Sequence, residues 1–280
     1  MAYSSGGLIE ATDYNGFAAS VNAVWGTGSG NSGYGQSTTL STVASSNTVT
    51  ATQWATLIAR IDSMRQHQSA ISSGLTQPTT GDTIEFLSTL NTQVSTITSN
   101  RLNNDVGTTQ LSTASASGST GWTSNAVREC KFTWSSANAM RYFFNAGGTV
   151  TANTISSSMS GNTKSSNWDT IANALSATVT NSTFWNNLST SNYTIDTATG
   201  SGADYGSNVG YLQVRLNAAP GSSSELIVRA YFVDGAADGF DDTVSGTFRV
   251  DAATNGSNTT YLTNTWGTPT ATNNLTVTQS

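Results

Sequence analysis

The sequence predicts an α+β protein, in which a helical N-terminal region is followed by a mainly antiparallel β-sandwich with short helices. Three observations lead to this fold class. In the N-terminal part, apolar residues recur every three or four positions, which is the spacing of one helix face. Further along, several segments alternate apolar and polar residues, as half-buried strands do. Few helical patterns separate those segments, and turn-rich gaps favour antiparallel pairing.

The same patterns divide the chain into three regions. Residues 1–104 form a helical region for docking or oligomerisation, and residues 123–280 form a β-sandwich domain. Residues 105–122 are rich in Ser, Thr and Gly and show no hydrophobic periodicity. We therefore predict that they are a linker between the other two regions.

Three helices are predicted in the N-terminal region. Thr12 or Asp13 caps the first, Thr50 and Gln53 form a capping box at the second, and Asp82 caps the third. Each helix carries an apolar stripe that must face either another helix or a neighbouring subunit. The stripes are Phe17, Val21, Val24 and Trp25; Trp54, Leu57, Ile58, Ile61 and Met64; and Ile84, Leu87, Leu90, Val94 and Ile97.

Strands are predicted from alternation in the C-terminal region. Cys130, Phe132 and Trp134 share one face of their segment, and the apolar run at 226–233 suits a central strand. The link 218–224 is predicted to join two strands as a hairpin connection. The predicted strands are 128–134, 211–216, 226–233, 247–250, 260–263 and 275–278, with short helices at 137–144 and 168–175, the second capped by Ser166.

Charge is scarce in this chain, and this narrows the classes of partner. Only 9% of the residues are charged, and the formal net charge is -6. Nucleic-acid binding requires clustered Lys and Arg, so no nucleic-acid partner is expected. No apolar stretch approaches the length of a membrane span, and the N-terminus lacks the basic and apolar parts of a signal peptide. We therefore expect synthesis in a cytoplasm and no membrane phase.

No residue pattern indicates catalysis. His67 is the single histidine, and no G-x-S-x-G nucleophile motif accompanies it. The spacing of Gly28, Gly30 and Gly33 matches a dinucleotide fingerprint, but the motif follows a helix instead of a strand, so a tight glycine loop is expected. Cys130 lies on the apolar face of its strand, which indicates a buried small side chain. We therefore expect a protein that is not an enzyme and needs no cofactor.

The densest acidic patch is the only candidate for a metal site. Carboxylate oxygens in a flexible loop suit Ca²⁺, but the spacing does not match an EF-hand loop. Asp and Gly serve turn geometry equally well. No metal site is therefore assigned, and the candidates for one are Asp234, Asp238, Asp241 and Asp242.

Aromatic residues suggest two kinds of contact surface. Trp122, Trp185 and Trp266 fall in predicted loops or element ends, where they could stack on the sugar rings of a host-surface glycan. A second set lies on or near the helical stripes, where it could pack against a neighbouring subunit or form the core of a single chain. The members of this second set are Trp25, Tyr34, Trp54 and Ile61.

Several ordered blocks carry a family resemblance. Asp13-Tyr-Asn15, Val21–Gly28, Gly33–Gln36 and Thr48–Ile58 resemble the N-terminal part of virion structural proteins of tailed phages, most closely those that infect cyanobacteria. Arg141–Gly148 resembles a string that recurs in the same proteins. The resemblance implies a structural role without catalytic residues.

Resemblance and composition together lead to a functional expectation. The chain is expected to be a non-enzymatic component of a tailed phage virion, in the tail assembly (fibre, baseplate or neck). It would pack in several copies against itself and other virion proteins, after synthesis in the host cytoplasm. Two alternatives stay open: a capsid decoration protein or head fibre, and a carbohydrate-binding host-recognition module.

Overall fold

The computed structural model describes residues 10–82, 87–118, 121–235 and 243–280. These residues form two compact units, each assembled from separate stretches of the chain. The first unit comprises Met1–Thr109, Arg141–Gly147 and Ser257–Trp266, and the remaining stretches form the second. The fold class is as predicted, because N-terminal helices precede two antiparallel sheets with short helices.

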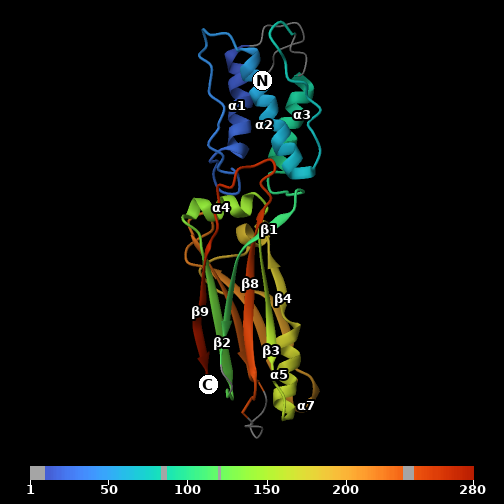
Figure 1. Cartoon of the computed structure of the whole chain (residues 1–280), viewed down its shortest axis with the longest axis vertical. Helices are drawn as coiled ribbons and strands as arrows, with labels where there is room; N and C mark the ends of the chain where they lie inside the picture. The colour runs from blue at the N-terminus through green and yellow to red at the C-terminus, as the bar shows by residue number, and fades with distance from the viewer. Residues whose placement is uncertain (1–9, 83–86, 119–120, 236–242) are drawn as a thin grey trace. The chain divides into compact units, whose positions relative to one another are not determined.

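The first unit is built on three helices that pack against one another, α1 (Ala11–Trp25), α2 (Ala51–Ser69) and α3 (Leu87–Ser99) (Figure 1). The predicted stripes of α1 and α2 are buried throughout, and so are Leu90, Val94 and Ile97 of α3. Ile84 and the side chain of Leu87 lie outside the described residues. The apolar periodicity of the sequence therefore identified the faces that form this core.

The helix starts confirm one predicted cap and correct another. Thr50 and Gln53 form the expected capping box of α2. In α1, however, the N-cap residue is Glu10, and Asp13 instead accepts the Glu10 backbone N–H from the third helical position. The Asp82 carboxylate accepts the backbone N–H of Thr79. The backbone that Asp82 would cap at the third helix, residues 83–86, lies outside the described residues.

The second unit contains two antiparallel sheets. One has the strand order β1-β8-β3-β4 and the other β5-β6-β7-β2-β9. The rings of Phe232 and Phe248, one from each sheet, stack with centroids 4.2 Å apart, so the two sheets face each other across a core. The strands are β1 (Thr108–Ser117), β2 (Asn125–Thr133), β3 (Thr149–Ser157), β4 (Ser176–Val179), β5 (Tyr193–Thr199), β6 (Val209–Leu216), β7 (Glu225–Val233), β8 (Thr247–Ser257) and β9 (Thr270–Gln279).

Short helices complete the fold: α4 (Ala137–Asn145), α5 (Thr163–Ala174), α6 (Asn181–Asn186) and α7 (Gly202–Tyr205). Helix α5 contacts β3, β5 and β6. The predicted cap at Ser166 is wrong, because Asn162 caps α5 and its side chain accepts the Ser165 N–H. Trp168 of α5 stacks on Phe232, which anchors this helix to the sandwich core.

Two predicted segments have a different structure. Residues 105–122, predicted as a linker, contain the ten-residue strand β1. Its polar Ser/Thr sequence hides the alternation, because small inward side chains such as Ala114 and Ala116 carry little hydrophobic contrast. Residues 260–263, predicted as a strand, form no strand. The backbone of Thr263 pairs instead with the side-chain amide of Gln36.

Both sides of the sandwich carry a β-bulge. In β9 the register shifts between the partners of Glu129 and Lys131, and the bulge presents Asn273 and Asn274. Their Oδ1 atoms accept the N–H groups of Ser115 and Ser117 in β1. In β5 a shift between Thr194 and Asp196 lets the Asp196 carboxylate accept the Ser176 N–H at β4. Side chains thus satisfy edge donors that would otherwise be open to another strand.

Candidate functional site

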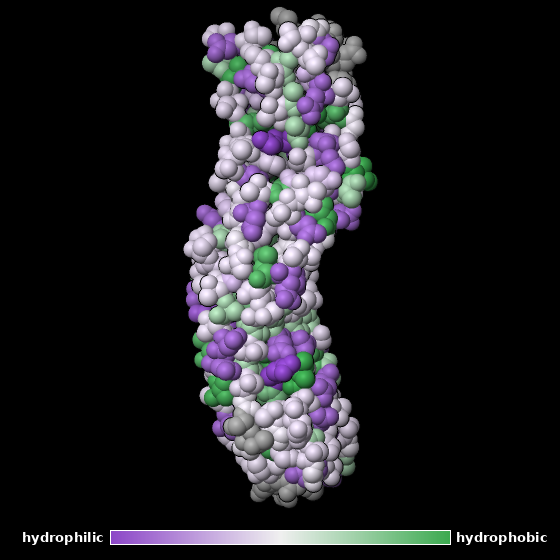
Figure 2. Space-filling model, in the orientation of Figure 1, coloured by the Kyte–Doolittle hydropathy of each residue, from purple (hydrophilic) through white to green (hydrophobic). Residues whose placement is uncertain are grey.

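The face of the molecule drawn in the space-filling view is weakly polar. In Figure 2, residues of intermediate hydropathy cover most of the visible face, with strongly hydrophilic and hydrophobic residues scattered among them. Among the described residues, no helix has both the length and the apolar character needed to cross a bilayer. In the same residues, no group of three or more His, Cys, Asp or Glu side chains could hold a metal ion.

The residues predicted as subunit-interface anchors lie in the interior of the first unit. Trp25, Tyr34, Trp54 and Ile61 expose 4% of their surface or less. Trp54 makes an edge-to-face contact with Tyr14 at 5.7 Å between ring centroids. Of the two alternatives given by the sequence, a subunit interface or the core of a single chain, their burial within one chain agrees with the second.

The glycine loop after α1 is organised around one arginine. The Arg141 guanidinium donates to the carbonyl oxygens of Thr27 (2.6 Å), Gly30 (3.3 Å) and Ser32 (2.8 Å). The amide of Asn145 donates to the carbonyls of Gly30 and Gly33. The loop therefore turns its carbonyl acceptors toward a cation. A dinucleotide-binding loop does the opposite, since it directs N–H donors at a phosphate.

Gly33 shows why this loop needs glycine. Its φ is 97°, and a Cβ atom there would lie 2.4 Å from the Thr27 carbonyl oxygen. An alanine would clash with the backbone that Arg141 binds. The spacing of Gly28, Gly30 and Gly33 thus has a conformational cause, as expected for a tight loop.

Tyr34 connects the glycine loop to α2 and α3. Its hydroxyl donates to the carbonyl of Arg101 at 2.7 Å and accepts from Gln68 Nε2 at 2.9 Å. Burial raises the pKa of this phenol well above its usual value. The ring also contacts His67 edge-on, with centroids 5.2 Å apart.

His67 and Cys130 are both deeply buried. Burial lowers the pKa of the His67 imidazole to about 4, and a hydrogen bond with the Ala146 backbone opposes this shift. Burial, with smaller contributions from Asp251 and Glu129, raises the pKa of the Cys130 thiol to about 12. At neutral pH both side chains are therefore uncharged, because burial disfavours the charged form of each.

The proposed metal and glycan residues have other surroundings. Asp234 forms an ion pair with Lys164, whereas Asp238, Asp241 and Asp242 lie outside the described residues. Trp122 and Trp266 are each only 1% exposed, so neither can form an open platform for a sugar ring. Trp185 is half-buried on α6, where it packs edge-on against Phe184.

A different aromatic surface lies on the outer face of the five-stranded sheet. Tyr211 and Tyr231 are directly opposite in the β6–β7 register, and their near-parallel rings have centroids 6.1 Å apart. The Arg229 guanidinium lies over the Tyr231 ring at 4.4 Å. We call this surface the tyrosine face and define it by Val127, Glu129, Tyr211, Arg215, Arg229 and Tyr231.

Two arginines share the one carboxylate of the tyrosine face, which leaves a single excess positive charge. Glu129 is 8% exposed and accepts two hydrogen bonds from the Arg215 guanidinium at 3.1 Å, while Arg229 Nε lies 3.8 Å from the same carboxylate. Tyr and Arg are the side chains that recur at energetically important interface positions. Tyr211 and Tyr231 were not among the predicted glycan-stacking residues, which are tryptophans in loops or at element ends. The alternation of 211–216 and 226–233 already placed both tyrosines on the polar side of their strands.

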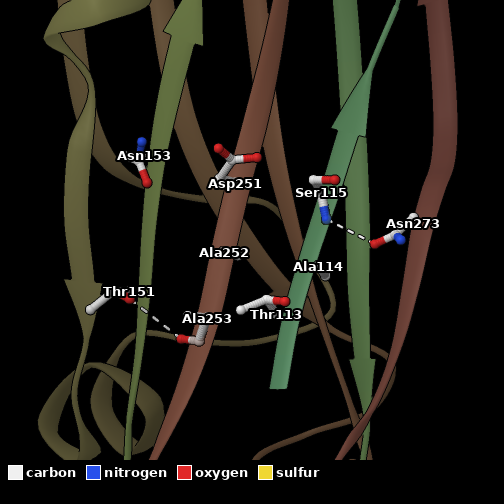
Figure 3. Close-up of a pocket in the computed structure, with 9 residues that line it drawn as sticks. All are labelled: Thr113, Ala114, Ser115, Thr151, Asn153, Asp251, Ala252, Ala253 and Asn273. Atoms are coloured by element: carbon white, nitrogen blue, oxygen red, sulfur yellow. Dashed lines mark hydrogen bonds between the residues drawn. The ribbon is translucent and has the colours of Figure 1, made fainter. Parts of the chain in front are cut away.

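The outer face of the other sheet carries a shallow groove of about 360 Å³. Thr113 and Ser115 of β1, Asn153 of β3 and Asp251 of β8 line it, around small alanine side chains (Figure 3). Asp251 is also paired with Arg249 at 2.8 Å. None of the lining residues is aromatic, so the groove offers hydrogen bonds without a stacking surface.

The chain was compared with known proteins in three ways. No protein-family model, no curated protein and no solved structure matches it.

Proposed function

We propose that this chain is a non-enzymatic structural component of a tailed phage virion. It acts in the tail assembly by packing in several copies against itself and other virion proteins. The observation that carries the proposal is the set of hydrogen bonds from Arg141 and Asn145 to the glycine loop of the first unit. Blocks that resemble phage virion proteins, Gly33–Gln36 and Arg141–Gly148, are far apart in the chain, yet Asn145 donates to the Gly33 carbonyl.

This contact supports a shared structural module as the basis of the resemblance. Composition alone could produce similar short strings in any chain rich in Gly, Ser and Thr. Composition alone gives no reason for Arg141 and Asn145, both in the block 141–148, to bind backbone carbonyls of the glycine loop that contains the start of the block 33–36. Because these two blocks contact each other in the fold, their likeness to phage virion proteins favours a shared architecture.

The tyrosine face is our candidate for the packing surface. Its ion pairs satisfy Glu129 within the chain, so a partner would meet aromatic area and few unpaired charges. Interface cores are similarly depleted in unpaired charge and enriched in Tyr and Arg.

Immunoelectron microscopy of intact virions tests the location. An antibody against this chain should label the tail, collar or fibres. Label spread over the capsid would replace this proposal with the decoration-protein or head-fibre alternative. Absence from purified particles would contradict both.

Native mass spectrometry of the purified chain tests the packing surface. The wild type should form oligomers that a Tyr211→Ser, Tyr231→Ser variant weakens. The matched control is Thr151→Ala with Asn153→Ala on the outer face of the other sheet, which should leave the oligomers intact. A wild type that stays monomeric at high concentration would contradict self-packing.

One observation favours a second function, host recognition through glycans. Tyr211 and Tyr231 present two near-parallel rings beside the donors of Arg229 and Gln213, and aromatic faces with polar neighbours suit sugar rings. Saturable binding to a glycan array, lost in the same tyrosine variant, would favour this function over purely architectural packing.

A further inference from the structure

A buried lysine and a largely buried aspartate meet at one end of the second unit. Lys164, in the first turn of α5, is 2% exposed, and its Nζ lies 2.6 Å from Oδ2 of Asp234. Asp234 follows β7 directly, and its side chain is 10% exposed. Lysine is almost never fully buried, and removing both charges from water is costly even when they are paired.

Three aromatic residues lie close in the sequence to the residues that form this ion pair or contact it. Trp168 lies one helical turn after Lys164, Phe232 lies two residues before Asp234, and Trp122 precedes Thr123, whose carbonyl accepts from Lys164 Nζ at 2.9 Å. The three rings contact one another, with the Trp122 and Trp168 centroids 4.6 Å apart. The contact between Trp168 of α5 and Phe232 of β7 holds these two elements together, which keeps Lys164 and Asp234 close to each other.

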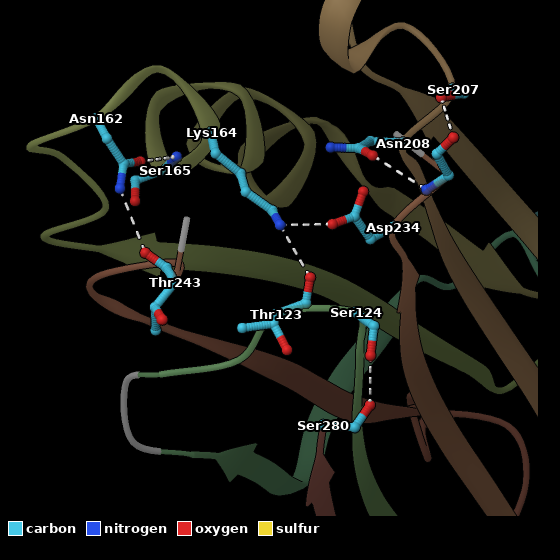
Figure 4. A network of polar contacts seen from close by, with 11 residues as sticks. Thr123, Ser124, Asn162, Lys164, Ser165, Ser207, Asn208, Asp234, Thr243 and Ser280 are labelled. Carbon is cyan, nitrogen blue, oxygen red and sulfur yellow. Dashed lines mark hydrogen bonds and ion pairs between the residues drawn. The ribbon is translucent and has the colours of Figure 1, made fainter. Parts of the chain in front are cut away.

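Asn208 supplies a further polar group beside the aspartate. It is fully buried, and its Oδ1 accepts the backbone N–H of Gly235, the residue after Asp234 (Figure 4). Its Nδ2 is buried and has no hydrogen-bond partner among the described residues. A buried amide donor without a partner is costly to a fold, which points to a role for it next to Asp234.

We propose that Lys164 and Asp234 condense to an intramolecular isopeptide bond, with Asn208 as a positioning residue. This inference is independent of the proposed virion function. The bond would join α5 covalently to the end of β7 without a cysteine pair.

The reaction needs no oxidant, reductant or other co-reactant. The Lys164 ammonium first passes a proton to Oδ2 of Asp234, which gives a neutral amine and a carboxylic acid. The Nζ lone pair then attacks Cγ, and the carbonyl electron pair moves onto Oδ1, where a donor such as Asn208 Nδ2 would stabilise the negative charge. A second proton moves from Nζ to Oδ2, water leaves, and the Nζ–Cγ amide remains.

Mass spectrometry of the denatured full-length chain tests the bond. The intact mass should be one water below the mass calculated from the sequence, and a tryptic digest should contain a branched peptide that links Lys164 to Asp234. The chain has two lysines, Lys131 and Lys164, so trypsin should cleave after the first and not after the second.

Variants locate the reacting groups. Lys164→Met and Asp234→Ala should each restore the full calculated mass, and Asn208→Ala should lower the fraction of bonded chain. The control is Lys131→Met, because Lys131 forms a comparable ion pair with Glu225 at 2.8 Å that is partly exposed. This control should keep the loss of one water.

The wild-type digest decides the question even where a variant fails to fold. An intact mass equal to the calculated one, with normal cleavage after Lys164, would overturn the proposal. Loss of one ammonia, with Lys164 linked to Asn208, would overturn the assignment to Asp234.

Discussion

At the scale of single residues, buried polar groups organise the first unit. Arg141 gathers three carbonyl oxygens of the glycine loop, and Tyr34 ties that loop to Arg101 and Gln68. Hydrogen bonds to a charged donor are stronger than neutral ones, and a buried carbonyl left without a donor is costly. The loop conformation therefore depends on a side chain that lies far from it in the sequence.

Replacing Arg141 tests this dependence. Arg141→Met should lower the free energy of unfolding by about 3 kcal/mol, because several carbonyls lose a charged donor at once. Arg141→Lys should recover only part of this loss, since a lysine keeps the charge without the planar fork. Urea denaturation followed by circular dichroism measures both. Equal stability of the wild type and Arg141→Met would contradict the central role of this guanidinium.

His67 makes the first unit sensitive to acid. Its folded pKa of about 4 lies below the ordinary value of 6.5, so between these pH values the unfolded chain binds a proton that the folded chain does not. The stability contribution is complete above pH 6.5 and is lost as the pH falls toward 4. At pH 4.5 the loss should be about 2 to 3 kcal/mol relative to pH 7.5.

The variant His67→Phe isolates this effect. Asp62 and Asp82, whose pKa values are lowered by hydrogen bonds, also lose stabilisation in acid, but over a lower pH range. The difference in melting temperature between wild type and His67→Phe, measured from pH 7.5 to 4.5, therefore reports His67. Parallel curves for the two proteins would show that His67 does not titrate during unfolding.

At the scale of elements, edge protection depends on bulges. The strands β5 and β9 each carry a bulge whose side chains accept backbone N–H groups of the facing sheet. Asp196 in β5 accepts an N–H of β4, and Asn273 and Asn274 in β9 accept N–H groups of β1. Asn274 has a φ of 49°, a conformation that asparagine tolerates better than most residues. Geometry and side-chain chemistry thus select the same residue at this position.

Removing the asparagine contacts should loosen β1. An Asn273→Ala, Asn274→Gly variant leaves the bulge conformation possible but removes both acceptors. We expect a loss of about 1 to 2 kcal/mol and faster hydrogen exchange at Ser115 and Ser117. Thr50→Ala, which removes the cap of α2, is the control, with a loss of about 1 kcal/mol. It should leave exchange in β1 unchanged. Unaltered exchange in the asparagine variant would show that these contacts do not protect the strand.

At the scale of the whole molecule, the helical unit is assembled from three stretches of the chain. Arg141–Gly147 and Ser257–Trp266 belong to the same unit as the N-terminal helices. The first stretch supplies Arg141 and Asn145, and the second supplies the Thr263 backbone that pairs with Gln36. The N-terminal helices alone therefore lack hydrogen-bonding groups that the rest of the chain supplies to their unit.

A truncated chain tests this completeness. The fragment 1–109 should be less stable than the same unit in the full chain, because the glycine loop and Gln36 lose their partners. Hydrogen exchange at the Tyr34 and Leu57 amides, compared between fragment and full chain, provides the measurement. Equal protection in both would show that the N-terminal helices fold independently, as the predicted boundary at residue 104 implies.

Local pattern alone determined the fold class, the faces of α1 and α2, and the main strands β2, β6 and β7. These features follow from periodicity, since an element must bury its apolar side. Only the tertiary structure decided that β1 is a strand, that Trp122 and Trp266 are buried, and that Lys164 meets Asp234. Each of these depends on a partner distant in the sequence, and periodicity carries no information about which distant surfaces come together.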